Sequence, residues 1–305
     1  MFLRQIEYLV ALADLGHFSR AAEACRVTQP ALSTAIGKLE KELGMALMRR
    51  GRNYEGLTEE GHRVVGWARH MLSGYRAMRQ EAGLAGKALA GTLRIGAIPT
   101  TMPIVPFLTA GVREAYPAIG LTVLSQPSDE IVRRLDRCDI DLGLSFLDER
   151  VLAGFVVHPL YRERYVLVAR DAALFGGQAV LAWADAAALP LCLLTPNMQS
   201  RQIVDAAFRR AGVRPHIAVE TDSIFALYAQ VRLSDVCAVV PHSLLSLIEL
   251  RQELAVVPLA PQLEREIGLV LRRQEPVPHL TSAVLGLALA VPLQPRFDRL
   301  INDLY

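Results

Sequence analysis

Polar side chains that can contact DNA gather in the segment between Thr28 and Gly44. Apolar residues spaced by four and three (Leu32, Ile36 and Leu39) predict that this segment is a helix with one buried face. The opposite face carries Gln29, Pro30, Ser33, Thr34 and Lys38. Pro30 suits the first turn of a helix, and the other four side chains can reach base edges and phosphates. We therefore expect this face to bind double-stranded DNA.

A basic segment follows this helix and contains Arg49, Arg50 and Arg52. Gly51 and Gly56 lie among and after these residues, which is typical of a short β-wing whose arginines contact phosphates or the minor groove. The alternative is a solvated basic loop.

Residues 1–90 hold 13 Lys and Arg against 9 Asp and Glu, whereas residues 91–305 hold 20 against 22. The basic excess belongs to the N-terminal third and favours a polyanionic partner there.

Two shorter helices are expected before the polar helix. Apolar residues spaced by three and four predict the first one: Leu3, Ile6, Val10 and Ala13. Gly16 should end it, Ser19 should be the N-cap of the second helix, and Thr28 should be the N-cap of the third. Three helices with a tight turn between the second and third predict a helix-turn-helix.

A long helix should begin after Thr58, because Glu59 and Glu60 follow this capping residue. Within it a heptad pattern runs through Val64, Ala68, Met71, Tyr75 and Met78. Such a pattern predicts a dimer with a second copy of the chain, and a two-fold dimer requires an interrupted palindromic operator. The alternative is an amphipathic helix that packs on its own domain.

These motifs occur together in one known family. The segments that carry the resemblance are Phe18-Ser19-x-Ala21-Ala22, Thr28-Gln29-Pro30-Ala31-Leu32-Ser33, Ile36-x-x-Leu39-Glu40-x-x-Leu43-Gly44 and Leu57-Thr58-x-x-Gly61. In them the chain resembles the winged helix-turn-helix of LysR-type transcriptional regulators. It departs from the family at Met48, where an aromatic residue is common, and at Thr34, where an arginine is frequent. The resemblance implies a tetramer as the usual assembly.

From Thr92 onward, short apolar strands alternate with helices, which predicts α/β lobes with parallel strands. The alternation restarts after Tyr161. We expect a winged helix-turn-helix domain at 1–58, a linker and dimerisation helix at 59–90, and an effector-binding domain at 91–305. The last resembles the two-lobed, periplasmic-binding-protein-like domain of the same family. Its first lobe should comprise about 91–160 and 268–305, and its second about 161–267.

Polar residues follow several of the expected strands, where ligands collect in open α/β sheets. The candidates are Thr100, Thr101, Gln126, Ser128, Asn197, Ser200, Arg201 and Thr221. Each one taken singly suits a helix N-cap, but together they predict an effector site between the lobes. Helix N-termini bind anions, and Arg201 is the one cation among these candidates, so a small anion is the expected effector. No cofactor is expected.

Other classes of function fit the sequence less well. The sequence lacks the common motifs of α/β enzymes, such as G-x-S-x-G and G-x-G-x-x-G, and a solute-binding protein would need a secretory signal, which Arg4, Glu7 and Asp14 interrupt. We therefore expect a cytoplasmic regulator with no membrane span. Peroxide-sensing members of the family use a reactive cysteine, and Gln199 aligns with that position. The cysteines here are Cys25, Cys138, Cys192 and Cys237; they are too far apart to suggest a zinc site or a disulfide framework.

Overall fold

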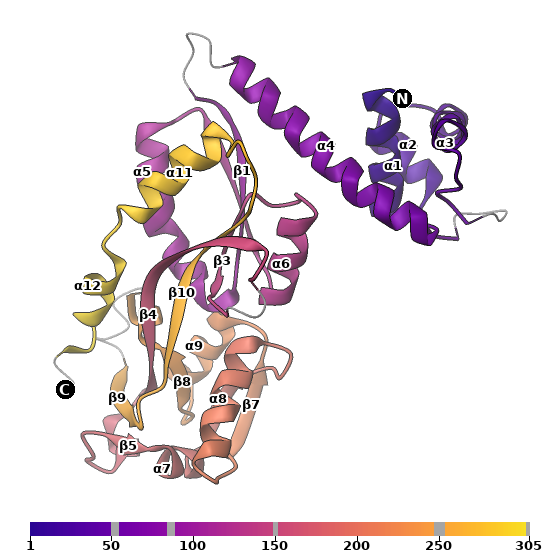
Figure 1. The fold of residues 1–305 in the computed structure, drawn as a ribbon. Helices are drawn as coiled ribbons and strands as arrows, with labels where there is room; N and C mark the ends of the chain where they lie inside the picture. Colours follow the sequence, from indigo (N-terminus) through magenta and orange to yellow (C-terminus); the bar gives the residue numbers. More distant parts are fainter. Residues whose placement is uncertain (50–54, 84–88, 149–151, 247–253, 303–305) are drawn as a thin grey trace. The chain divides into compact units, whose positions relative to one another are not determined.

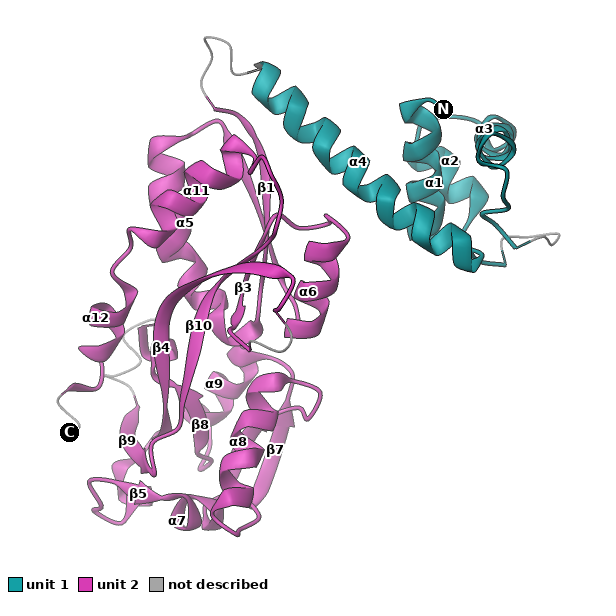
Figure 2. Ribbon diagram, in the orientation of Figure 1, with its two compact units in different colours: residues 1–87 teal, residues 88–305 magenta. Residues whose placement is uncertain are grey.

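The computed structural model describes residues 1–49, 55–83, 89–148, 152–246 and 254–302. The chain divides into two compact units, residues 1–87 and 88–305 (Figure 2). The division lies close to the boundary expected at the end of the linker helix. Of the expected wing residues, Arg50 and Arg52 lie outside the described residues.

The first unit begins with three helices: α1 (Leu3–Leu15), α2 (Phe18–Ala24) and α3 (Gln29–Leu43). The expected stops are confirmed, because Gly16 and Gly44 adopt left-handed backbone angles with φ of 61° and 69°. Thr28 caps α3 by accepting a hydrogen bond from the Ala31 amide at 3.4 Å. The expected cap at Ser19 is wrong. His17 precedes α2 in extended conformation, and its Nδ1 accepts the Ser19 amide hydrogen at 3.2 Å, so an imidazole replaces the hydroxyl as the cap.

The wing is anchored where α4 (Glu59–Gly83) begins. Met48 and Leu57 form an antiparallel bridge, which confirms the base of a two-stranded wing. Thr58 Oγ1 accepts the Gly61 amide at 2.9 Å and donates to the Ala46 carbonyl at 2.8 Å. A Cβ atom on Gly61 would lie 2.1 Å from the Leu47 carbonyl oxygen, so only glycine permits this close approach.

Glu40 of α3 also binds the start of the wing. Its Oε1 accepts the amide hydrogens of Leu47 and Met48 at 2.7 Å and 3.0 Å. Charge-assisted hydrogen bonds of this kind are stronger than neutral ones. The carboxylate therefore fixes the start of the wing relative to α3.

Replacing Glu40 tests this anchor. In Glu40→Ala the two amides lose their acceptor, so their hydrogen exchange should accelerate by roughly tenfold or more, as expected for losing about 1–3 kcal/mol of local stability. Glu40→Gln keeps an acceptor oxygen and should retain most of the protection. Amide exchange measured on the full chain decides the matter: unchanged rates at Leu47 and Met48 in Glu40→Ala would show that the carboxylate does not hold the wing.

The second unit contains two lobes. In the first lobe the strands β1 (Gly91–Ala97), β2 (Ile119–Ser125) and β3 (Leu142–Phe146) are parallel, as expected. The helices of this lobe are η1 (Pro99–Ile104), α5 (Val105–Ala115), α6 (Ser128–Asp136) and α11 (His279–Leu289). The second lobe contains η2 (Ala172–Phe175), β5 (Leu181–Ala182), α7 (Trp183–Ala188), β6 (Leu191–Leu194), α8 (Gln199–Arg210), β7 (Ile217–Thr221), α9 (Ile224–Leu233), β8 (Ala238–Pro241), η3 (His242–Ser246) and β9 (Ala255–Ala260).

Two long antiparallel strands join the lobes, so the expectation of parallel strands alone is too simple. These strands, β4 (Phe155–Ala169) and β10 (Glu264–Arg272), pair side by side (Figure 1). In the first lobe β10 also pairs with β3, and in the second lobe β4 also pairs with β8 and β9. The result is a mixed sheet with strand order β2-β1-β3-β10-β4-β9-β5, with β8 on β4, while β6 and β7 form a parallel pair of their own.

The end of the chain is apolar. The stretch His279–Asp298 is long and apolar enough to cross a membrane by length and composition alone. In the structure it is two helices, α11 and α12 (Leu293–Asp298), with Leu280, Val284 and Phe297 buried in the protein core. Beyond α12, Ile301 belongs to a buried hydrophobic cluster of the second lobe that includes Val166, although we expected residues up to 305 to belong to the first lobe.

Candidate functional site

The exposed face of α3 is the one expected to contact DNA. All five residues expected on this face are exposed: Gln29, Pro30, Ser33, Thr34 and Lys38. Leu32, Ile36 and Leu39 on the opposite face are buried. Ser19 of α2 donates to Gln29 Oε1 at 2.9 Å, which orients this side chain. Arg49 is exposed at the base of the wing, where its amide donates to the Gly56 carbonyl at 3.0 Å.

The expected dimerisation pattern of α4 is divided between two faces. Ala68 is 2% exposed and packs, together with Val64, in a cluster that contains Ile6 and Leu9 of α1. Arg69, itself buried, pairs with Asp14 of α1. This side of α4 therefore covers its own domain, as expected for an amphipathic helix that packs on its own domain, and Val64 and Ala68 are not available to a second copy.

A different set of large apolar residues on α4 is exposed. Trp67, Met71 and Met78 are 72%, 46% and 59% exposed, and Tyr75 is half-buried. With Gly74 between them, the exposed residues keep a spacing of four, three and four. They form one stripe along the helix, which we call the 67–78 stripe. Exposed large apolar side chains in such a row mark an interaction surface.

Three of the expected effector residues meet in a small cavity between the lobes. Thr100 comes from η1 of the first lobe, and Ser200 and Arg201 come from α8 of the second. Thr100 is 2% exposed, and its Oγ1 has no hydrogen-bond partner among the described residues. A buried hydroxyl without a partner is costly, so this group is well placed to receive one from a ligand.

Arg201 does not provide a free positive charge. Its guanidinium contacts Asp205 at 2.8 Å and Glu220 at 2.7 Å and also donates to the Leu194 carbonyl. Its side chain is 6% exposed. Two carboxylates already neutralise this cation, so the expectation that it binds an anionic effector is not supported.

The remaining expected residues lie elsewhere. Gln126 accepts from Arg134 in its better amide orientation, and Ser128 is hydrogen-bonded to Ser145 at 2.9 Å. Thr101 donates to the Ile98 carbonyl at 3.0 Å, and Thr221 accepts the Ser223 amide at 3.2 Å. Asn197 is exposed in the turn before α8. None of these residues lines the small cavity.

A larger apolar cavity adjoins the small one and was not foreseen from the sequence. Its volume is about 280 Å³, and it lies between η1 of the first lobe and α9 and η3 of the second. Ile224, Leu227, Val240 and Leu244 line both cavities. Pro99, the neighbour of Thr100, lines the apolar one. The only sequence signal is the low polarity of α9, which equally suits a packed core.

A third cavity of about 620 Å³ is polar and lies at the N-terminus of α8. Gln199 lines it together with Arg162 and Arg265, and the carboxylates of Asp148, Glu264 and Glu266 are also present. The three acidic residues outnumber the two arginines. An excess of negative charge opposes the binding of an anion.

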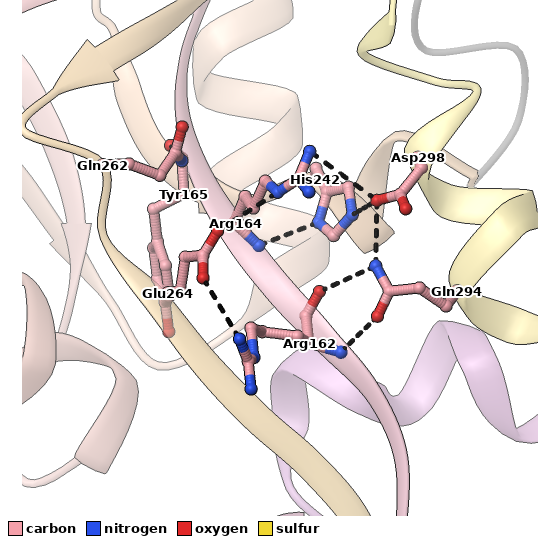
Figure 3. A network of polar contacts seen from close by, with 8 residues as sticks. All are labelled: Arg162, Arg164, Tyr165, His242, Gln262, Glu264, Gln294 and Asp298. Atoms are coloured by element: carbon pink, nitrogen blue, oxygen red, sulfur yellow. Dashed lines mark hydrogen bonds and ion pairs between the residues drawn. The ribbon is translucent and has the colours of Figure 1, made fainter.

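A network of charged and polar residues surrounds β4 and β10, the two strands that join the lobes (Figure 3). Gln294 of α12 accepts the Arg162 amide at 2.6 Å and donates to the Arg162 carbonyl at 3.3 Å. The Arg164 amide donates to His242 Nδ1 at 3.0 Å, and the Arg164 guanidinium reaches Glu264 of β10 at 3.3 Å. Burial lowers the pKa of His242 to about 4, so this histidine is a neutral acceptor. Thus α12, η3 and β10 all bind β4 where it passes between lobes.

Glu163 points to the other side of β4 and is fully buried. The Tyr165 hydroxyl donates to Glu163 Oε1 at 3.0 Å. Burial raises the pKa of Glu163 to about 8, although this hydrogen bond and the charge of Arg265 lower it. The carboxyl group is therefore largely protonated at neutral pH.

This buried carboxyl predicts a pH dependence of stability. The unfolded chain releases the Glu163 proton near pH 4.5 and the folded chain near pH 8, so the free energy of unfolding should fall as pH rises between these values, by a few kcal/mol in order of magnitude. Glu163→Gln replaces the titrating carboxyl group with an amide that stays neutral. The variant should therefore be more stable than the parent at pH 8 but not at pH 4.5. His242 titrates in both proteins and cancels in the comparison.

Urea unfolding of the parent and Glu163→Gln at several pH values checks this. Glu266→Gln, which changes an exposed carboxylate of β10, is the matched control and should follow the parent. Parallel stability curves for the parent and Glu163→Gln would contradict the assignment.

The thiols are inaccessible or poorly ionised. Cys138, Cys192 and Cys237 are buried, and all four cysteines are free. Burial raises the pKa of Cys192 and Cys237 to about 11. Burial is also the main cause of the raised pKa of Cys25, and the negative charge of Glu7 adds to it. Since the thiolate is the reactive form, none of these three is activated for oxidation.

The comparisons with known families cover both units. Residues 3–62 match the bacterial regulatory helix-turn-helix protein, lysR family, and residues 86–292 match the LysR substrate binding domain. The chain belongs to the LysR family of transcriptional regulators. It is accordingly a DNA-binding regulator with a winged helix-turn-helix followed by a two-lobed domain, which confirms the resemblance seen in the sequence.

Individual relatives are similar to this chain across both of its units. The DNA-binding transcriptional dual regulator OxyR of Escherichia coli is 27% identical over 305 residues, covering 99% of both chains. The SDS degradation transcriptional activation protein of a Pseudomonas species is 32% identical over 296 residues, covering 94% of this chain and 95% of its own. A solved structure of full-length OxyR from Pseudomonas aeruginosa superposes with a TM-score of 0.76 at 25% identity, covering 97% of each chain.

Proposed function

We propose that this LysR-family regulator is cytoplasmic, binds an interrupted palindromic operator as a homodimer or homotetramer, and responds to a small-molecule effector between its lobes. The observation that carries the effector proposal is Thr100 Oγ1, buried and without a partner among the described residues. Ser200 of the other lobe lines the same cavity. A ligand that forms a hydrogen bond with this hydroxyl contacts both lobes. It can thereby favour one arrangement of the two lobes over another.

Thiol-based redox sensing is the second candidate, because several relatives are OxyR proteins or hydrogen peroxide-inducible genes activators. In this chain Gln199 occupies the aligned start of α8, and a glutamine amide cannot be oxidised as a thiol can. The burial and raised pKa of Cys192 and Cys237 further disfavour reaction with peroxide. Ligand binding is therefore the better-supported mode of control.

The α3 face is tested by operator binding. Ser33→Glu places a carboxylate where we infer that the major groove lies, and it should abolish the mobility shift of the specific operator. Lys38→Ala should weaken binding to every sequence and reduce the slope of log affinity against log salt by about one unit, as expected for one lost phosphate contact.

The matched control is Ser282→Glu, the same change at an exposed position on α11 of the second unit. It should bind the operator as the parent does. Operator affinity that is unchanged in Ser33→Glu would refute the placement of α3.

We infer that the 67–78 stripe of α4 joins two copies of the chain, in place of the pattern that included Val64 and Ala68. Met71→Asp together with Met78→Asp would bury two carboxylates in such an interface and should shift the protein to monomers. Arg76→Asp changes the net charge by the same amount about half a turn round the helix from the stripe, and it should remain oligomeric. Light scattering distinguishes the outcomes. A double variant that assembles like the parent would exclude the stripe as the interface.

A further inference from the structure

We propose that the effector is an uncharged aliphatic molecule of medium chain length, whose chain fills the apolar cavity and whose hydroxyl reaches Thr100. This inference rests on the proposed function and specifies the ligand of the same interlobe site. It replaces the small anion expected from the sequence. Three observations support it: the size and lining of the cavity, the position of Thr100, and the state of Arg201.

The apolar cavity is large enough for a ligand. Protein interiors are close-packed, and voids larger than a water molecule are few. A cavity of 150 Å³ lined by apolar side chains stays dry and binds benzene, so by proportion the 280 Å³ here would hold roughly eleven non-hydrogen atoms. The lining is aliphatic and aromatic, from Met102 of η1 to Val231 of α9. Phe225 lines the cavity and is 76% exposed, which places its mouth at the surface of α9.

A hydroxyl group is the polar end that the adjoining small cavity can satisfy. Thr100 Oγ1 can donate to or accept from a ligand hydroxyl, and its hydrogen-bonding capacity is unused among the described residues. Pro99 and Thr100 are consecutive and line the apolar and the small cavity respectively. Because the two cavities share four lining residues, a chain in the first cavity can extend its end toward Thr100.

A charged end group does not fit this site. Among the described residues that line the two cavities, Arg201 is the only charged one, and Asp205 and Glu220 already neutralise it. An ionised carboxylate moved into this site would lose its hydration without gaining a counter-ion. A neutral hydroxyl loses much less and gains a hydrogen bond to Thr100.

The test uses 1-decanol, which has eleven non-hydrogen atoms, titrated calorimetrically into the full chain with decanoate as its charged counterpart. We expect 1-decanol to bind at least tenfold more tightly than decanoate. In the series 1-decanol, 1-octanol and 1-hexanol, affinity should fall about fourfold for each methylene removed, because each one buries apolar surface. Decanoate binding as tightly as 1-decanol would overturn the uncharged class of ligand.

Two variants locate the site. Ile224→Trp fills the boundary that both cavities share and should abolish binding of 1-decanol. Leu233→Trp makes a comparable change at a position on α9 that is 75% exposed and lines neither cavity, and it should bind like the parent. Thr100→Val keeps the side-chain shape and should weaken 1-decanol about tenfold. If Ile224→Trp binds 1-decanol normally, or the parent does not bind it, the inference is wrong.

Operator binding separates this inference from the function on which it rests. A parent protein that shifts its operator but ignores 1-decanol leaves the regulator intact and rejects the ligand class. A parent protein that fails to bind any operator rejects the proposed function whatever its affinity for 1-decanol. In the expected outcome, 1-decanol changes operator affinity in the parent and in Leu233→Trp but not in Ile224→Trp.

Discussion

The antiparallel pairing of β4 with β10 is the constraint on which the effector domain depends. The register runs from Glu264 opposite Arg164 to Arg272 opposite Phe155, so a single ladder passes through both lobes. In the first lobe β10 continues the sheet through β3, and in the second lobe β4 continues it through β8 and β9. Neither lobe can therefore shift far without breaking hydrogen bonds of the other.

The ladder is reinforced where it passes between the lobes. On one side the side chains of Gln294 and His242 bind the backbone of β4, and on the other side the buried Tyr165 hydroxyl donates to Glu163 Oε1. Because these hydrogen bonds are made to the main chain of β4, they do not depend on the rotamers of its own side chains and fix the strand itself. The cavities lie beside this strand, between η1 of the first lobe and α9 of the second. We propose that a ligand there changes the balance between two arrangements of the lobes.

Local signals predicted the elements that are decided locally. Thr28, Gly16 and Gly44 set helix ends through backbone geometry that neighbouring residues determine, and the structure confirms all three. The predicted N-cap of α2, Ser19, is wrong, because the imidazole nitrogen of His17 accepts the amide hydrogen that a capping hydroxyl usually accepts. A strand as long as β4 is not predicted from the sequence, because Pro159 and the charged residues near Arg162 interrupt the apolar pattern. These charged residues fit a strand only because the three-dimensional structure gives each face of β4 its own partners.

The α4 helix shows why a heptad pattern alone cannot assign an interface. Its apolar residues occupy more than one face, and Val64 and Ala68 are used by α1 while Trp67 and Met78 remain exposed. The sequence contains both sets, and the spacing of three and four fits either of them. Only the position of α1 decides which set is covered. Tertiary packing thus determines which apolar face of α4 stays exposed, and the heptad pattern by itself does not.

The chemistry of the effector site follows the same rule for charge. Arg201 was the one cation among the expected residues, and from sequence this favoured an anionic ligand. Asp205 follows it by one helical turn, and Glu220 comes from β7, which lies beside β6 in the sheet. A guanidinium held by two carboxylates has no charge left for a ligand, whereas the Thr100 hydroxyl, which carries no charge, has no hydrogen-bond partner among the described residues. What a site can bind depends on which of its polar groups are already satisfied, and that is a property of the fold. The residue types alone do not determine it.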